Sequence, residues 1–288
     1  MRKKQTLYFA ALLTVIFLSL ISLVLSAHAL TISQYSLAYP NLTAPIRIVQ
    51  LTDLHNSEFG ENNKKLIEKV AAREPDLILI TGDLLNQNEE RTDIAETLIS
   101  GLAGIAPVFV SFGNHERGYE SRYGADIRAV YEAAGAAVLE YDWMDLELKG
   151  QTIRLGGIYG YCLPAKYAST GEARPRETEF LAAFQDTVDL TVLMCHMPVC
   201  WIINGSLDEW DVDLVLSGHS HGGQARFPLI GGLWAPDQGW FPGRMSGLYQ
   251  SSDGTKTMVL SRGLGNTEGL PRFNNIPEVL VLDLLPAE

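Results

Sequence analysis

Five short apolar runs recur along the chain, and each ends at polar residues that can bind a metal. The runs are residues 46–51, 77–81, 108–112, 191–195 and 214–217. Short apolar runs bounded by turn-forming residues are typical of strands buried on both faces of a parallel sheet. Helical patterns follow the first three runs. This alternation predicts βαβ units and a mostly parallel central sheet. The expected helices are residues 62–73, 92–102 and 127–134.

The second half of the chain predicts a second sheet. Residues 146–148 and 152–155 flank Lys149-Gly150-Gln151, a hairpin-like signal. A helix at 177–184 would return the chain to the fourth apolar run, and residues 278–284 would form a final core strand.

Residues 222–249 form a long segment rich in glycine, proline and aromatic residues. Long loops of this kind are often functional. Two interpretations of Trp234, Trp240 and Phe241 stay open. They could cover the core, or they could contact an apolar substrate or the membrane interface.

The N-terminus carries a membrane-directed segment. Arg2, Lys3 and Lys4 precede an almost uninterrupted apolar stretch at residues 7–27, which is long enough to span a membrane. Ala27-His28-Ala29 is also a pattern that signal peptidase cuts. We favour a retained anchor over a cleaved signal. Because positive charge stays on the cytoplasmic side, the remaining chain is expected outside the cytoplasm.

The order of these elements along the chain predicts three segments. They are an anchor or signal peptide at 1–29, a stalk at 30–45 that could add an edge strand, and one domain at 46–288. With 288 residues, 47% of them hydrophobic, the chain can bury a substantial core. The net charge of −12 argues against a nucleic-acid partner, which would require a basic face.

Cysteine usage is weakly informative. Cys162, Cys195 and Cys200 are odd in number and lack metal-type spacing. We expect Cys195 to be a buried thiol. A bridge between Cys195 and Cys200 stays open, since spacing cannot establish it.

The ends of the five runs supply oxygen and imidazole ligands together, including five of the six histidines. In open α/β sheets, sites lie beyond the carboxyl ends of the strands, so these side chains can converge. Such a mixed set suits Mn, Fe or Zn better than Mg. It is too large for one four-coordinate ion and fits two ions sharing a carboxylate. The candidates are Asp53, His55, Asp83, Asn114, His115, His196, His219 and His221.

These residues lie in blocks that resemble, in order, the five blocks of the calcineurin-like metallophosphoesterases. Later motifs resemble the membrane-associated bacterial branch with YkuE- and YaeI-like phosphodiesterases. One departure is Glu116, where many bacterial relatives have Asp. The five blocks are Asp53-Leu54-His55, Gly82-Asp83, Gly113-Asn114-His115-Glu116, Cys195-His196-Met197-Pro198 and Gly218-His219-Ser220-His221; the later motifs are Gly222-Gly223-Gln224, Ser261-Arg262-Gly263-Leu264-Gly265 and Arg272 with Pro277-Glu278.

The resemblance implies an α/β/β/α sandwich of two mixed sheets flanked by helices, and a two-metal site. His115 would contact the scissile phosphate and protonate the leaving oxygen, while a bridging hydroxide attacks phosphorus in line. Asp83 would bridge the two ions. One ion would be held by Asp53, His55, Asp83 and His221, and the other by Asp83, Asn114, His196 and His219.

The expected activity is hydrolysis of a phosphodiester, phosphomonoester or pyrophosphate bond, with a membrane-associated or lipid-linked substrate favoured. The alternatives are a phosphatase of soluble nucleotides or phosphoproteins, and a non-catalytic metal-containing binding module. Arg117, Arg122 and Arg262 are candidate phosphate clamps, because guanidinium matches phosphate oxygens bidentately. Solvated surface arginines are the alternative interpretation, and Arg262 is favoured among the three.

Overall fold

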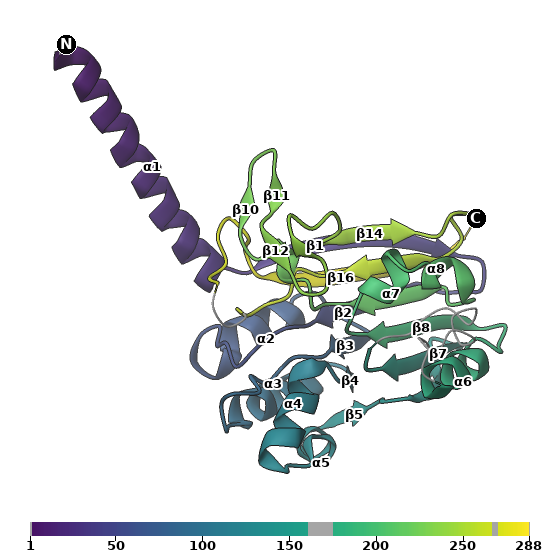
Figure 1. Cartoon of the computed structure of the whole chain (residues 1–288). Coiled ribbons are helices and arrows are strands. Elements are labelled where there is room, and N and C mark those ends of the chain that lie inside the picture. Colours follow the sequence, from purple (N-terminus) through teal and green to yellow (C-terminus); the bar gives the residue numbers. More distant parts are fainter. Residues whose placement is uncertain (1, 161–174, 267–269, 288) are drawn as a thin grey trace.

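Two six-stranded sheets are stacked face to face, with helices on both outer sides (Figure 1). The computed structural model describes residues 2–160, 175–266 and 270–287. This arrangement confirms the expected α/β/β/α sandwich. The first sheet has the order β1 (Thr31–Tyr39), β16 (Glu278–Pro286), β2 (Ile46–Leu51), β3 (Leu77–Thr81), β4 (Val108–Ser111), β5 (Ala136–Val138).

The second sheet contains the predicted hairpin as β6 and β7, which pair antiparallel. Its inner strands β7, β8, β9 and β15 are parallel, as are β2 to β5 in the first sheet. The carboxyl ends of the five apolar runs therefore lie at common sheet edges. The order is β14 (Gly247–Gln250), β15 (Thr257–Leu260), β9 (Leu214–Ser217), β8 (Leu190–Cys195), β7 (Gln151–Ile158), β6 (Asp142–Leu148).

Alternating side chains of the buried strands enter two different cores. In β3, Leu77 and Leu79 point between the sheets, whereas Ile78 and Ile80 face the helices of the first sheet. Successive strand residues point to opposite faces, so a strand covered on both sides must be apolar throughout. This explains why the runs show no alternation of polar and apolar residues.

Helices α2, α3 and α5 supply the core on the outer face of the first sheet, and α6, α7 and α8 supply that of the second. In α3, Ile94, Leu98 and Leu102 recur at helical spacing and are buried. The pattern missed α4, which has few apolar residues. The bounds are α2 (Lys64–Ala71), α3 (Asp93–Ala103), α4 (Asn114–Tyr123), α5 (Ile127–Ala133), α6 (Pro175–Phe184), α7 (Val199–Ile202), α8 (Ser206–Glu209), with short 3-10 turns η1 (Glu61–Asn63) and η3 (His221–Gly223).

The N-terminal segment has two parts. Helix α1 (Arg2–His28) projects from the body of the molecule (Figure 1) and is long and apolar enough to cross a membrane, although a signal sequence would pass the same test. Strand β1 then pairs in parallel with β16 over its full length. The expected stalk is therefore largely an edge strand of the first sheet.

The long segment at 222–249 is organised as two small hairpins before β14 begins. They are β10 (Arg226–Phe227) with β11 (Gly231–Gly232), and β12 (Trp234–Ala235) with β13 (Gly239–Trp240). Cys195 and Cys200 are buried free thiols, so the bridge left open by the sequence does not form; Cys162 lies outside the described residues.

We expect truncation of Leu79, in the core between the sheets, to lower the stability of the fold. Leu79 is fully buried there. Leu79→Ala should lower the free energy of unfolding by about 2–5 kcal/mol through lost burial and the cavity left behind. Urea denaturation measures the free energy of unfolding. The control Val188→Ala, at an 89% exposed residue, should have little effect. Equal losses from the two variants would contradict the placement of Leu79 in the core between the sheets.

Candidate metal centre

The candidate ligands converge because each follows a strand of one of the two facing sheets. Asp53 and His55 follow β2, Asp83 follows β3, and Asn114 begins α4 directly after β4. His196 follows β8, and His219 and His221 follow β9. Asp53, Asp83 and the histidines at 55, 196, 219 and 221 are all buried. The structure thus brings the seven residues expected as ligands to one region at the carboxyl ends of both sheets.

Asp53, His55 and His221 form one cluster of possible ligands. The Nε2 atoms of His55 and His221 are 3.3 Å apart, and His221 Nε2 lies 3.3 Å from Asp53 Oδ1. Asp83 Oδ2 is 3.7 Å from His55 Nε2. These four residues are the set expected to hold the first ion.

Asp83, His196 and His219 form a second cluster. His196 Nε2 lies 3.1 Å from Asp83 Oδ2 and 3.2 Å from His219 Nδ1. The Nδ1 atom of His196 is 2.7 Å from the carbonyl oxygen of Thr81, which orients the ring. Asp83 is thus adjacent to both clusters, as a bridging carboxylate would be.

The donor atoms fit divalent cations. Pairs of imidazole nitrogens face each other beside carboxylates, an arrangement that a cation between them would stabilise. The buried Asn114 Oδ1 atom has no hydrogen-bond partner within the described part of the chain. A buried polar atom without a partner is costly, and a bound cation would satisfy this oxygen.

The electrostatics of the site favour positive charge. Burial opposes protonation of His196, yet the Asp83 carboxylate raises its pKa to about 10. Burial would likewise raise the pKa of Asp53, but the imidazoles of His221 and His55 hold it below its usual range. Both carboxylates therefore favour a cationic partner, which is the property required of a metal site.

The backbone at the site is strained. Asp53, His55, Asp83, His219 and His221 all have positive φ, between 46° and 67°. Residues with side chains rarely adopt this region, and they persist there only where the surrounding structure holds them. Five of the seven expected ligands share this conformation, which sets the site apart from ordinary strand ends.

Glycines allow close packing around both carboxylates. A Cβ atom at Gly113 would lie 2.1 Å from Asp83 Oδ1, and one at Gly218 would lie 2.4 Å from Asp53 Oδ2. These separations are far inside van der Waals contact. Any larger residue at either position would displace a carboxylate.

Glu116 holds the loop that carries Asp83. Its buried carboxylate accepts hydrogen bonds from the backbone N–H groups of Asp83, Leu84 and Gly113, at 2.8 Å each. It also accepts one from the hydroxyl of Tyr131 at 2.9 Å. Glu116, which stands where many bacterial relatives have Asp, therefore has a structural role. Its side chain joins the loop after β3 to the start of α4.

His115 is held as a neutral imidazole with a defined tautomer. Burial lowers the pKa of His115 to about 4. The backbone N–H of Gln87 donates to His115 Nδ1 at 3.2 Å, so the hydrogen resides on Nε2. The His115 ring lies edge-on to His55, with centroids 4.4 Å apart. His115 can therefore offer one N–H donor beside the first cluster.

Two contacts of the cluster were missed by the sequence analysis. Asp237, from the segment between β12 and β13, lies 3.1 Å from His219 Nε2. The buried Arg272 places Nη2 3.4 Å from His221 Nδ1 and donates to the carbonyl of Arg262. Neither residue has a spacing signal, although Arg272 lies in a motif that the sequence analysis had noted.

The three candidate arginines differ in their surroundings. Arg262 forms an ion pair with Glu278, and Arg117 pairs with Glu120 and Glu140. Arg122 is exposed on α4. In this structure, the guanidinium groups of Arg262 and Arg117 are thus engaged by carboxylates of the chain.

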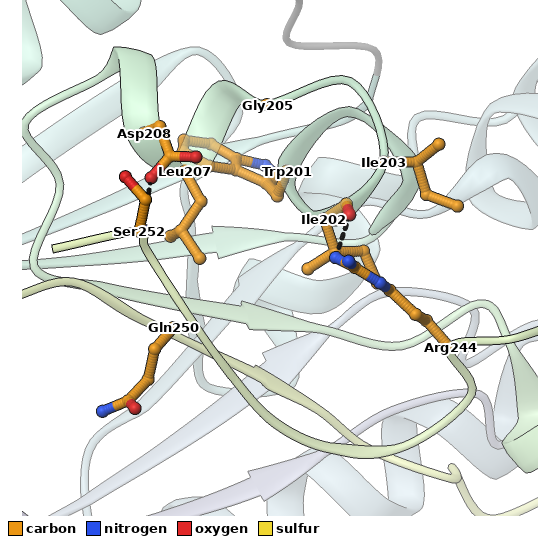
Figure 2. A pocket seen from close by; sticks show the side chains of 9 residues that line it. All are labelled: Trp201, Ile202, Ile203, Gly205, Leu207, Asp208, Arg244, Gln250 and Ser252. Atoms are coloured by element: carbon orange, nitrogen blue, oxygen red, sulfur yellow. Dashed lines mark hydrogen bonds between the residues drawn. The ribbon is translucent and has the colours of Figure 1, made fainter. Parts of the chain in front are cut away.

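A cavity of about 300 Å³ lies beside α7 and α8. Its lining includes Trp201, Asp208 and Arg244, whose guanidinium donates to the carbonyl of Ile202 (Figure 2). None of the expected metal ligands lines it. This cavity is therefore separate from the cluster of candidate ligands, although α7 begins shortly after His196.

Comparisons with known proteins agree with this geometry. Residues 46–223 match the model of the family described as calcineurin-like phosphoesterase. The chain is 30% identical to the phosphodiesterase YaeI of Escherichia coli (strain K12), over 84% of this chain and 83% of YaeI. It is 28% identical to the uncharacterized metallophosphoesterase YkuE of Bacillus subtilis (strain 168), over 83% and 78%.

Among solved structures, the phosphopantetheinyl hydrolase PptH of Mycobacterium tuberculosis matches with a TM-score of 0.43 and 14% identity. The match covers 76% of this chain and 89% of PptH.

We predict that Glu116→Ala destabilises the fold by about 3–5 kcal/mol, because it leaves buried donors of two loops unpaired. Thermal or urea unfolding of the metal-free protein measures the loss. Glu120→Ala is a matched control on the same helix, where the carboxylate is partly exposed and pairs with Arg117. Similar stability of the two variants would show that Glu116 does not hold the Asp83 loop.

Proposed function

Because this chain belongs to the calcineurin-like phosphoesterase family, whose members are metal-dependent hydrolases, we propose that it cleaves phosphoric ester or pyrophosphate bonds with two divalent ions. Mn, Fe and Zn suit the mixed oxygen and imidazole donors. The observation that carries the proposal is the two His/Asp clusters, which a third group of His55, Asp83 and His115 connects. A non-catalytic binding module would not require both clusters intact.

We infer the ligands from these clusters and, for Asn114, from its place after β4 and its unpaired buried Oδ1. Asp53, His55 and His221 would hold one ion and Asn114, His196 and His219 the other, with Asp83 between them. When bound, such ions supply an activated water and offset charge on the phosphoryl group. The chain itself contributes rigid positioning, since strained backbone and close-packed glycines hold Asp53 and Asp83.

His115 would act on the substrate directly. Its Nε2–H is fixed as a donor by the hydrogen bond that Nδ1 accepts from Gln87. A donor in this place can bind a phosphoryl oxygen whose charge grows in the transition state. To protonate the leaving oxygen, His115 would first have to become the imidazolium, because a neutral imidazole that lost its Nε2–H would be left as an imidazolate.

A phosphodiester or pyrophosphate in a membrane-associated, lipid-linked molecule is the substrate class we favour. The relative YaeI is named a phosphodiesterase. Helix α1 could anchor the enzyme, and Trp240 and Phe241 are exposed close in sequence to Asp237, which contacts His219. A phosphatase of soluble nucleotides or phosphoproteins would not need these apolar features.

Asp83→Asn should abolish hydrolysis, because the shared carboxylate would be lost while the side-chain shape is kept. Turnover of an aryl phosphodiester after Mn²⁺ loading measures the effect, with circular dichroism to verify folding. Metal analysis of the unsubstituted protein should give about two ions per chain. Asp142→Asn, the same change on the exposed edge strand β6, is the control.

Retained activity of Asp83→Asn would refute the bridging role. Unsubstituted protein with less than about one ion per chain after reconstitution, and without turnover, would instead indicate a binding module.

His115→Ala should lower kcat by about 10²–10⁴-fold while metal content is unchanged.

Comparing substrates with different leaving groups separates the two possible roles of His115. If His115 protonates the leaving oxygen, the loss should be large for alkyl leaving groups and small for 4-nitrophenol. If it only binds the phosphoryl group, the loss should be equal for both. Unchanged kcat with every leaving group would remove His115 from the reaction. His28→Ala, at the end of α1, is the control.

A further inference from the structure

An uncharged apolar hairpin tip projects from the domain on the side where α1 leaves it (Figure 1). Residues 227–236 contain no charged side chain. Leu229 is completely exposed and Ile230 is 62% exposed, while Phe227 is also among the exposed large hydrophobic residues. Large apolar side chains clustered at the tip of a hairpin are unfavourable in water and indicate a contact surface.

The hairpin tip lies beside the apolar length of α1. Pro228, Val15, Leu18 and Ser22 line one cavity of about 360 Å³ between the two elements. The apolar stretch ends at Ala27. Ser22 lies five residues before it, about 8 Å along a helix, and Val15 lies twelve residues before it, about 18 Å. If residues 7–27 fill the hydrocarbon layer, the tip is at the depth of lipid acyl chains.

Hydrogen bonds fix α1 against the domain near this point. The backbone N–H of Asn274 donates to Ser22 Oγ at 2.8 Å, and that of Asn275 donates to Ser26 Oγ at 3.1 Å. Ser19, Ser22 and Ser26 are less exposed than the other described positions of α1. The helix and the hairpin are therefore held side by side.

We propose that the β10–β11 hairpin tip is a second membrane contact, embedded in the lipid bilayer beside α1. This inference rests on the membrane anchoring in the proposed function and adds an element that the anchor alone does not require. Trp240 and Phe241, 64% and 61% exposed on the neighbouring hairpin, suit the interface just outside the acyl chains.

The contact would also place the metal centre at the membrane surface. Asn275, whose backbone binds α1, donates through Nδ2 to the carbonyl oxygens of His221 and Gln224 at 2.6 and 3.0 Å. The base of the hairpin begins two residues after Gln224. The same loop thus carries a candidate metal ligand and the membrane-embedded tip, so a lipid-linked phosphate would meet the site without leaving the bilayer.

Depth-dependent quenching tests the proposal on the full chain in vesicles of phosphatidylcholine and phosphatidylglycerol. Leu229→Cys carries an environment-sensitive fluorophore in a Cys162→Ser background, since Cys195 and Cys200 are buried. Val24→Cys in α1 reports on the anchor itself. Val188→Cys is the exposed control. The side chain of Asn41 donates to the Val188 carbonyl, and Asn41 follows the C-terminal end of β1, so this position is far from α1.

We expect blue-shifted emission and strong quenching by acyl-chain nitroxide lipids at Leu229 and Val24, but not at Val188. Quenching at Val24 without quenching at Leu229 would overturn the hairpin contact and leave the anchor intact. Absence of quenching at both positions would overturn the anchor and the hairpin contact together. A shift at Leu229 that grows with protein density, without lipid quenching, would assign the tip to a second copy of the chain and refute the bilayer contact.

Discussion

Two fully buried carboxylates, Asp53 and Asp83, are the constraint on which the rest of the structure depends. A buried charge is costly unless it is paired and hydrogen-bonded. Here the partners come from both sheets. The backbone N–H of His219 donates to Asp53 at 3.0 Å, and the backbone N–H of His115 donates to Asp83 at 2.8 Å. These contacts require the ends of β2, β3, β4 and β9 to meet, which explains why the sheets must face each other in this register.

Stacking two sheets also explains how distant parts of the chain share the site. Gln50 in β2 donates to Thr81 in β3 and to the carbonyl of Ser217 in β9, at 2.9 and 3.0 Å. This buried amide joins the two sheets just before the strand ends that carry the clusters. An apolar residue there would pack equally well but would not fix their relative position, because directional hydrogen bonds specify register where apolar contacts do not.

Much of this arrangement could be predicted from the sequence, because the relevant signals are local. Apolar runs indicated five strands, and the polar residues following them indicated the site. Other features depend on tertiary contacts. Helix α4 lacks an apolar face and is fixed by the Glu116 carboxylate, while Asp237 approaches His219 from a segment that resembles an irregular loop in sequence. Strand β1 forms only because β16, over 200 residues later, supplies its partner.

Helix α1 is connected to the candidate ligands through a short series of hydrogen bonds. Ser26 accepts from the backbone of Asn275, and the Asn275 side chain donates to the carbonyl of His221. His221 itself has a positive φ of 46°, a conformation maintained by its surroundings. Since the Asn275 amide supports that backbone, the seating of α1 and the position of a candidate ligand are physically coupled. A free tether would provide no such coupling, so the site and helix α1 form one structural unit.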